Sequence, residues 1–340
     1  MSSTPPPPPP HPRTVVVIGG TGTFGGAVAR SLHANPSTFH VRATTRDPRT
    51  PKATRLARLG ISVVRADSWN ASDLAAAFRD DTWAVFLNTD SDDPDFKAQR
   101  GPPESAMGRV VVDAAVAAGV KHFVYAGLPE ASRVTGGAVP ILSFDEKAAI
   151  AAYARKAGFE SAVTVTSGWA LEIFWMRAYA EAFGGFAMVR DAEGFLTLNV
   201  PPMGNEPEGS VPWTAVEDDY GDAVHGVLLD PRRWDGRTVW AVSECRSFEE
   251  VTEAYNRVTG TMEARYVVKE GALEAGTEGK TKEVNGLFDY CHYVKGEYCD
   301  GKPLDQESMK LLKRMASVAR GCEKSDLQTV EGFMAKKISK

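Results

Sequence analysis

The 340-residue chain is 43% hydrophobic and 24% charged, the composition of a globular protein with room for one large domain and a smaller lobe. Its 39 basic and 44 acidic side chains give a formal net charge of -5 without a basic block, which argues against direct binding of nucleic acid. No apolar run reaches the roughly 20 residues of a membrane span, and the N-terminus lacks a signal-peptide layout. We therefore expect a cytoplasmic protein that binds no membrane.

The cysteine and histidine patterns predict no metal site. The spacing of the cysteines is too irregular for a metal knuckle or a C-x-x-C redox pair, and the six histidines form no H-E-x-x-H cluster. We expect reduced structural thiols at Cys245, Cys291, Cys299 and Cys322.

The first twelve residues contain six consecutive prolines, Pro5 to Pro10. Proline fixes φ and has no backbone N–H, so this run cannot join a helix or a sheet. We expect residues 1–12 to form a disordered or polyproline II tail, with a ligand for a proline-recognition domain as the alternative.

A strand, a glycine turn and a helix follow the tail. The apolar run Val15 to Ile18 is typical of a strand buried on both faces, and a helical pattern resumes at Ala27. The glycines between them fit G-x-G-x-x-G from Gly20 or G-x-x-G-x-x-G from Gly19; they are Gly19, Gly20, Gly22, Gly25 and Gly26. Such a turn lets a pyrophosphate approach the amides and the dipole of the helix N-terminus. This context predicts a dinucleotide site, the alternative being a plain turn without a ligand.

The second and third predicted strands place polar residues beside the adenosine half of such a nucleotide. Arg46 follows the strand Phe39 to Thr44, where an arginine accommodates the 2′-phosphate of NADP and an acid would select NAD. Asp47 would repel that phosphate unless it orients Arg46 or begins a turn. Asp67 follows the strand Ile61 to Arg65, and it either accepts from the adenine amino group or forms the turn into the next helix.

The fourth strand, Trp83 to Leu87, delivers Asn88 and Thr89 to the same sheet edge, where open parallel sheets bind ligands. A polar loop from Ser91 to Pro103 follows. The next predicted elements are a helix from Ala106 to Ala118, a strand from His122 to Ala126 and a loop from Gly127 to Leu142.

A helix beginning at Ser143 has two interpretations. Ser143 and Glu146 fit a capping box, whereas Ser143 and Lys147 keep the spacing of a Tyr-x-x-x-Lys catalytic pair with serine in place of tyrosine. Lys147 lies in the first turn, where the helix dipole disfavours a cation without a partner, so we expect it to be functional rather than a solvent-exposed helix lysine.

The strand Ser161 to Thr166 leads through Ser167 into a predicted aromatic helix, Trp169 to Phe183, beside the nicotinamide end. Glu172 is either a base in the pocket or a surface residue. The aromatic side chains form either core or a substrate cage.

Beyond Gly185 the pattern changes to a smaller lobe. We expect a strand pair over Phe186 to Val200 with a turn at Asp191 to Gly194, and then a loop from Pro201 to Pro212. A helix within Trp213 to Asp230, a strand at Arg237 to Val242, a helix at Ser247 to Thr259 and a strand at Met262 to Val268 complete the predicted elements.

Several segments together resemble the NmrA-like group of atypical short-chain dehydrogenases/reductases. They are GGTGTFGG from Gly19, TTRDP from Thr44, AAGVKHFVYAGLPE from Ala117, FDEKAAIAAYAR from Phe144, DDYGDAV from Asp218 and FEEVTEAYNRVTG from Phe248. The resemblance implies an α/β protein with a doubly wound, parallel-sheet Rossmann fold. Its NADP-binding Rossmann domain would span residues 13–184, and a C-terminal α+β substrate lobe would span 185–340, with segments returning to the Rossmann sheet.

The resemblance also implies a site. NADP(H) would be bound through Gly19, Gly22, Thr23, Phe24, Gly25 and Arg46, with Asp67, Asn88, Thr89, Lys147 and Ser167 along the same edge. Lys147, Ser143 and Glu172 are the candidate catalytic residues. Ser143 in place of tyrosine, and Ala126 in place of the usual catalytic serine, depart from the broader dehydrogenase pattern.

Three functions remain open after these departures. The first is an NADPH-dependent reductase of a small organic substrate. The second is a non-catalytic NADP(H) sensor or transcriptional co-regulator, and the third is a non-redox catalyst acting on a bulky small molecule while retaining NADP(H). The sequence leaves a homodimer or a protein partner open as well.

Overall fold

The computed structural model describes residues 9–79, 82–204, 210–323 and 325–339. Residues 1–8 of the predicted proline-rich tail, and residues 205–209 of the predicted loop Pro201 to Pro212, lie outside this range. None of the helices in the described part of the chain combines the length and the apolar character that a bilayer span requires.

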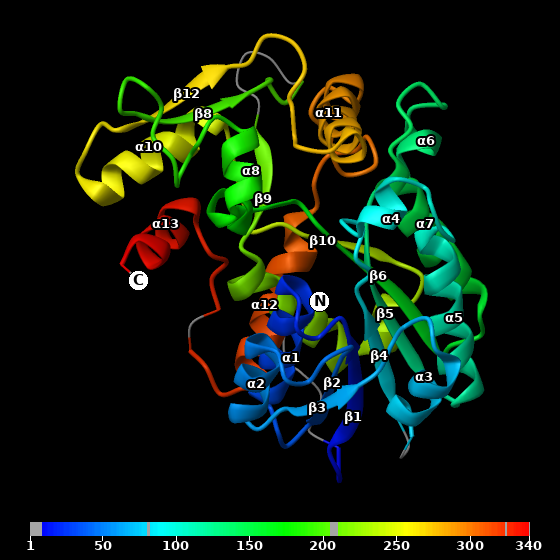
Figure 1. The fold of residues 1–340 in the computed structure, drawn as a ribbon. Coiled ribbons are helices and arrows are strands. Elements are labelled where there is room, and N and C mark those ends of the chain that lie inside the picture. The colour runs from blue at the N-terminus through cyan, green and yellow to red at the C-terminus, as the bar shows by residue number, and fades with distance from the viewer. Residues whose placement is uncertain (1–8, 80–81, 205–209, 324, 340) are drawn as a thin grey trace.

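A central sheet of seven parallel strands organises the molecule (Figure 1). Its order, β10-β6-β5-β4-β1-β2-β3, contains the dinucleotide-fold order 3-2-1-4-5-6 extended by one further strand. This confirms the predicted doubly wound α/β fold. The strands are β1 (Arg13–Ile18), β2 (Phe39–Thr45), β3 (Ser62–Arg65), β4 (Ala84–Leu87), β5 (His122–Gly127), β6 (Ser161–Ser167) and β10 (Thr238–Ala241).

The residues of β1 alternate between two helical layers, as period-two geometry requires. Val15 and Val17 pack into the core under one layer, while Val16 and Ile18 pack into the core under the other. The first layer contains α1 (Thr23–His33), α2 (Pro51–Arg58), α9 (Gly221–Leu229) and α12 (Gln306–Ala319). The second contains α3 (Ala71–Ala77), α5 (Glu104–Ala117) and α7 (Leu142–Lys156).

A second group of elements lies beyond the carboxyl edge of the sheet, at the top of Figure 1. Its strands are β7 (Trp169–Ala170), β9 (Val211–Thr214) and β11 (Glu244–Arg246) in one small sheet, and β8 (Leu196–Val200) with β12 (Ala264–Val268) in another. Its helices are α8 (Arg177–Ala182), α10 (Phe248–Thr259), α11 (Glu278–Tyr293) and α13 (Val330–Ile338). Short helical turns elsewhere are α4 (Pro94–Lys97), α6 (Ala131–Val134) and the segments Leu171–Trp175, Val216–Tyr220 and Pro231–Trp234.

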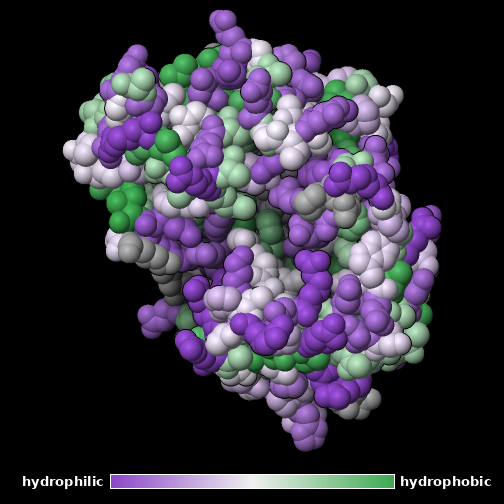
Figure 2. Space-filling view, in the orientation of Figure 1, coloured by the Kyte–Doolittle hydropathy of each residue, from purple (hydrophilic) through white to green (hydrophobic). Residues whose placement is uncertain are grey.

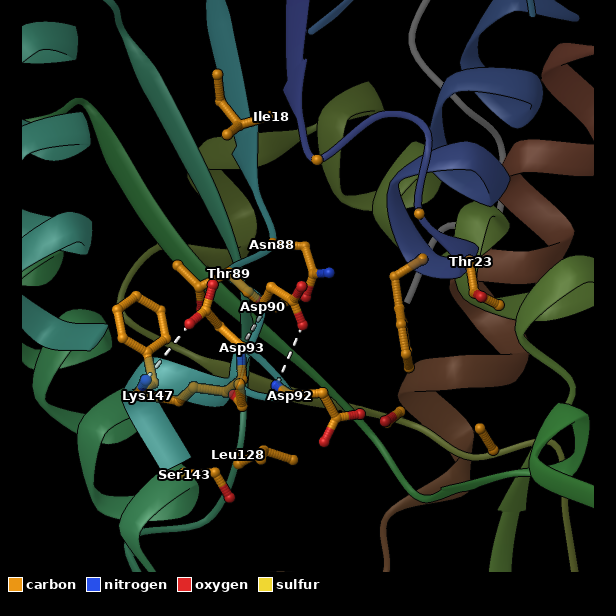
Figure 3. A pocket seen from close by; sticks show the side chains of 18 of the residues that line it. Ile18, Thr23, Asn88, Thr89, Asp90, Asp92, Asp93, Leu128, Ser143 and Lys147 are labelled. Carbon is orange, nitrogen blue, oxygen red and sulfur yellow. Dashed lines mark hydrogen bonds between the residues drawn. The ribbon is translucent and has the colours of Figure 1, made fainter. Parts of the chain in front are cut away.

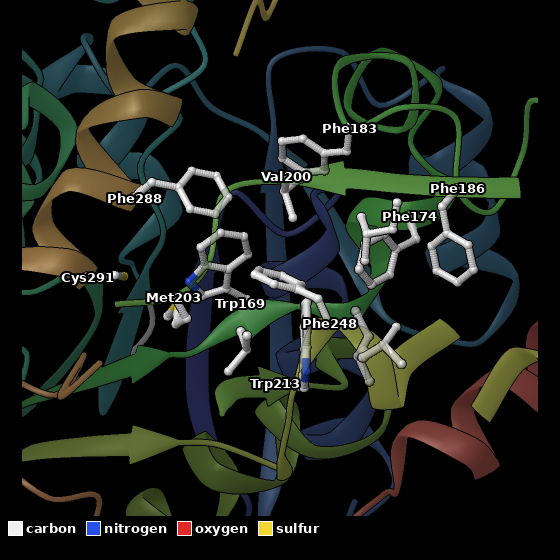
Figure 4. Close-up of a cluster of buried hydrophobic side chains, with 14 of the residues drawn as sticks. Trp169, Phe174, Phe183, Phe186, Val200, Met203, Trp213, Phe248, Phe288 and Cys291 are labelled. Atoms are coloured by element: carbon white, nitrogen blue, oxygen red, sulfur yellow. The ribbon is translucent and has the colours of Figure 1, made fainter. Parts of the chain in front are cut away.

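Aromatic rings fill the core of this second group (Figure 4). Trp169 meets Trp213, Phe248 and Phe288 at centroid distances of 6.0, 5.7 and 5.2 Å, all edge to face. Phe174 is buried in the same cluster. These rings therefore form core, which was one of the two interpretations of the aromatic segment, while Trp169, Tyr179 and Phe183 also line the cavity described below.

Three predicted elements are corrected. The aromatic segment is not one helix, because Met176 adopts extended backbone angles (φ -102°, ψ 105°) between the turn Leu171–Trp175 and α8. The strand pair over Phe186 to Val200 is the single strand β8, whose partner is β12. Trp213 belongs to β9 rather than to the helix that follows, because it pairs with Glu244 of β11.

Candidate cofactor and substrate site

A cavity of about 870 Å³ runs along the carboxyl ends of the central strands and extends toward α8 and α11. Figure 2 shows a recess near the middle of this face, with hydrophilic side chains around its rim. Every candidate cofactor or catalytic residue except Gly25 lines the cavity: Gly19, Gly22, Thr23, Phe24, Arg46, Asp67, Asn88, Thr89, Ser143, Lys147, Ser167 and Glu172. The structure thus brings the sequence candidates together at one place.

The glycine turn depends on two close backbone approaches. Gly19 has a positive φ of 75°, and a Cβ there would lie 2.8 Å from the carbonyl oxygen of Asn88. Gly25 lies beneath the turn, where a Cβ would come within 2.2 Å of the Gly19 carbonyl oxygen. Helix α1 starts after Gly22 with neither a side-chain cap nor an acid in its first turn. The amides of this helix start are therefore suited to an anionic ligand.

In the basic loop after β2, Arg46 and Arg49 have different surroundings. Arg46 is exposed and lines the cavity. Asp47 accepts from both the backbone N–H and the side chain of Arg49, at 2.9 Å each, and these bonds lower the pKa of Asp47. Asp47 therefore forms the turn and orients Arg49, not Arg46. Arg42 lies elsewhere, buried with its guanidinium donating to the carbonyl oxygen of Ala77 at 2.7 Å.

Asp67 forms a turn, which is one of the two roles that the sequence left open. Its carboxylate accepts from the backbone N–H of Trp69 at 3.0 Å, which is the turn interpretation. The same residue also lines the cavity. An interaction with an adenine ring remains a prediction.

Lys147 is buried, with only 6% of its surface exposed, which excludes the solvent-exposed alternative. Its Nζ lies 3.0 Å from the carbonyl oxygen of Thr89, 2.7 Å from Thr89 Oγ1 and 3.0 Å from Glu104 Oε1 (Figure 3 shows the contact with Thr89). Three acceptors match the three N–H donors of an ammonium group. Tyr125 contacts the Thr89 hydroxyl at 2.9 Å, and Ser91 donates to Glu104 at 2.8 Å. Lys147 is thus the centre of a buried polar network.

Ser143 does not form the predicted capping box, and that interpretation is wrong. Helix α7 begins at Leu142 with Ile141 as its N-cap, so Ser143 already lies in the first turn. Glu146 turns away and accepts from the backbone N–H of Ser105 at 2.7 Å. The Ser143 hydroxyl instead donates to the carboxylate of Glu283, which belongs to α11.

Glu172 is buried, so its surface alternative is wrong. Its Oε1 accepts from the backbone N–H of Glu217 at 2.9 Å, while Oε2 has no hydrogen-bond partner among the described residues. Burial raises the pKa of Glu172, and the backbone hydrogen bonds oppose that rise only in part. A raised pKa favours the protonated form of this carboxyl group relative to an exposed glutamate, which is the property required of a general acid.

Sequence comparison assigns the family. The model of the NmrA-like family matches residues 11–333. The chain belongs to the NmrA-like family. Among its curated relatives, the NmrA-like family domain-containing oxidoreductase notA of Aspergillus sp. (strain MF297-2) is 37% identical over 321 residues, which cover 94% of each chain.

Solved structures of NmrA-like and related proteins share the fold at low sequence identity. NmrA, a negative transcriptional regulator solved in complex with NADP, has a TM-score of 0.75 at 20% identity, covering 96% of this chain and 95% of its own. The triphenylmethane reductase of Citrobacter sp., complexed with NADP(H), has a TM-score of 0.65 at 18% identity, covering 96% and 99%. These likenesses show that the chain shares its fold with proteins that were solved with NADP or NADP(H) bound.

Sequence reasoning missed three residues of this NmrA-like site. Glu104 pairs with Lys147, Glu283 accepts from Ser143, and Lys97 lies beside Glu283. Glu104 and Lys97 come from the segment between β4 and β5, and Glu283 lies 140 residues beyond Ser143. Each is an ordinary charged residue within its local sequence. Only the tertiary arrangement distinguishes them from solvated surface charges.

Proposed function

We propose that this chain is an NADPH-dependent reductase of a small organic substrate that contains a C=O, C=N or C=C bond. The observation that supports this most directly is the single cavity that joins Arg46, the glycine turn and Lys147 to an apolar end near Ile173. A relative named as an oxidoreductase and a neighbour solved with NADP(H) agree with that assignment.

The residues present fit the cofactor. The turn that would hold a pyrophosphate keeps its shape only while Gly19 and Gly25 lack a Cβ, and the first turn of α1 has no side-chain cap, so its amides are open to an anion. The exposed guanidinium of Arg46 would hold the 2′-phosphate. Once bound, the dihydronicotinamide supplies a hydride.

The protein's own groups orient the reaction. Lys147 fixes Thr89 through two hydrogen bonds and is itself fixed by Glu104, so it would position the ribose end of the cofactor. The apolar side chains at the far end of the cavity would bind the substrate and exclude water. They include Leu128, Phe144, Ile173, Met176, Val284 and Leu287.

Calorimetric titration tests the cofactor assignment. We expect NADPH to bind the wild type more tightly than NADH does. Arg46→Ala should weaken NADPH by about 10- to 100-fold, the worth of a charge-assisted contact, and leave NADH unchanged. Arg58→Ala, at the exposed end of α2, is the matched control. Equal affinities of the Arg46→Ala variant and the wild type for NADPH would contradict the assignment.

NADPH consumption tests the reaction itself. Suitable electrophiles are 9,10-phenanthrenequinone, a cyclic imine and the cationic dye malachite green. Tight binding of NADPH without its oxidation by any of them would contradict the reductase and leave the sensor.

Glu172 favours a second function, proton transfer without redox chemistry. The observation behind it is the buried carboxyl group with a raised pKa and one oxygen without a partner in the described structure. Turnover that persists when NADP⁺ replaces NADPH would support it, and strict dependence on NADPH would exclude it.

A further inference from the structure

Three groups that can exchange protons stand in contact at the wall of the cavity, and we call them the Ser143–Glu283–Lys97 chain. The backbone N–H of Ser143 donates to Glu283 Oε1 at 3.1 Å, and its hydroxyl donates to Oε2. Lys97 Nζ lies 3.5 Å from the same Oε2. The side chains of Lys97 and Glu283 are only 11% and 12% exposed.

The Ser143–Glu283–Lys97 chain lies between two cavities. All three residues line the main cavity and also a second one of about 210 Å³. The second cavity is bounded by the exposed residues Gln99 and Gly101. A proton that enters from the solvent side can therefore cross the wall through these side chains.

Lys147 is poorly placed to supply that proton. Its three N–H donors already face Thr89 and Glu104. Ser143 lies one helical turn before Lys147 and lines the substrate side of the cavity. Figure 3 shows the Ser143 hydroxyl apart from the contact between Lys147 and Thr89.

We propose that the Ser143–Glu283–Lys97 chain delivers the proton that must accompany hydride transfer to a carbonyl or imine. This rests on the proposed reductase function. The Ser143 hydroxyl turns from Glu283 to the substrate, its O–H bond breaks, and its proton forms a bond to the substrate oxygen or nitrogen. Lys97 passes a proton to the Glu283 carboxylate, which passes it on to the Ser143 oxygen, so that Glu283 is a carboxylate before and after the step. Lys97 then regains a proton from a hydronium ion of the solvent. Ser143 is the group that touches the substrate, while Glu283 and Lys97 act through it as positioning residues.

A pair of probes separates proton delivery from hydride transfer. Reduction of a 9,10-phenanthrenequinone carbonyl needs a hydride and a proton. Malachite green is a carbocation, so its reduction to the leuco dye needs a hydride alone. Glu283→Gln and Ser143→Ala should each lower kcat for the quinone by about 100-fold, the usual worth of a general acid. Both variants should reduce the dye within about twofold of the wild-type rate.

Two controls exclude a merely structural effect. Glu278→Gln changes an exposed carboxylate on the same helix, α11, and should alter neither reaction. The Kd of NADPH, measured by fluorescence titration, should be the same for all variants. If the wild type reduces the quinone but not the dye, this unchanged Kd takes the place of dye reduction as evidence that the cofactor site is intact.

The outcomes are distinct. Equal losses for quinone and dye, or no loss, would overturn the relay and leave the reductase standing. If Glu172→Gln lowers kcat for the quinone but not for the dye, while the Ser143 and Glu283 variants do not, Glu172 rather than Ser143 supplies the proton. Wild-type reduction of the dye but not of the quinone would overturn the relay, and no reduction of either would overturn the reductase with it.

Discussion

At the scale of single residues, Gly25 decides whether the nucleotide turn can form. A Cβ at this position would lie 2.2 Å from the Gly19 carbonyl oxygen, a backbone atom that cannot move without opening the turn. We expect Gly25→Ala to weaken NADPH binding by at least about 10-fold, the loss of roughly one good contact. Gly101→Ala is the control, because nothing lies within 4 Å of its added Cβ. Unchanged affinity of Gly25→Ala in calorimetry would refute this role of the glycine.

Sequence reasoning succeeds for residues whose function is local and fails for those whose partner is distant. The positions of Gly19 and Gly22 are recognised because a strand, a turn and a helix follow one another in one short stretch, and the position of Arg46 is recognised because it directly follows the next strand. Ser143 and Glu146 form an equally good local pattern, yet each finds a tertiary partner, Glu283 and the amide of Ser105. Tertiary hydrogen bonds override the local capping preference there.

At the scale of elements, all the strands up to β6 are predicted close to their observed bounds, whereas the helix α2 is not predicted and the short helices α4 and α6 lie in predicted loops. Parallel strands buried on both faces are continuous apolar runs, which are easily recognised. The segment after β6 is not, because its aromatic side chains fit a helix and a core turn equally well. The break at Met176 arises from packing around Phe174 and Trp213, whose rings lie 5.3 Å apart.

We predict that the ionisation of Glu172 makes the free energy of unfolding depend on pH. Burial raises the pKa of Glu172 above its value in the unfolded chain. Its contribution to stability is therefore present at acidic pH and is lost as the pH rises through the folded-state pKa. Glu172→Gln keeps an acceptor for the Glu217 amide and cannot ionise, so it should be more stable than the wild type at pH 8 by roughly 1 kcal/mol. Urea denaturation should show this gain vanishing near pH 4, and a gain independent of pH would contradict the explanation.

At the scale of the whole molecule, an acidic segment from Glu217 to Asp222, before and within α9, forms ion pairs with the C-terminal helices α12 and α13. Asp218 pairs with Lys336 of α13, and Glu217 pairs with Lys337. The same segment supplies the amide that holds Glu172. The helix α11 brings Glu283 to Ser143 in a similar way. The site is therefore completed by chain segments that lie far beyond β6.

Asp222 is the buried residue of this acidic segment that pairs with two cationic side chains. It pairs with Arg320 at 2.9 Å and with Lys313 at 2.8 Å, both on or next to α12. Burial alone would raise the pKa of Asp222, but the hydrogen bond from Arg320 and the two cationic charges outweigh it and lower the pKa to about 2. A lowered pKa gives stability above the unfolded-state value, which is lost as the pH falls toward 2. Asp222→Asn would leave the Arg320 guanidinium without its carboxylate partner, while Lys313 keeps its pair with Asp219, so the substitution should cost about 3 kcal/mol at pH 7.

Urea denaturation from pH 7 to pH 2 measures both parts of this prediction for Asp222. The difference between wild type and Asp222→Asn should be constant down to about pH 4, the ordinary carboxyl range, and then narrow. Asp289→Asn, on the exposed side of α11, should change the free energy of unfolding by less than about 0.5 kcal/mol. A cost at pH 7 no larger than that of the Asp289 control would show that α12 is held by apolar packing alone. In that case Met309, Leu312 and Met315, which are buried in the same core as the apolar residues of α9, would account for its attachment.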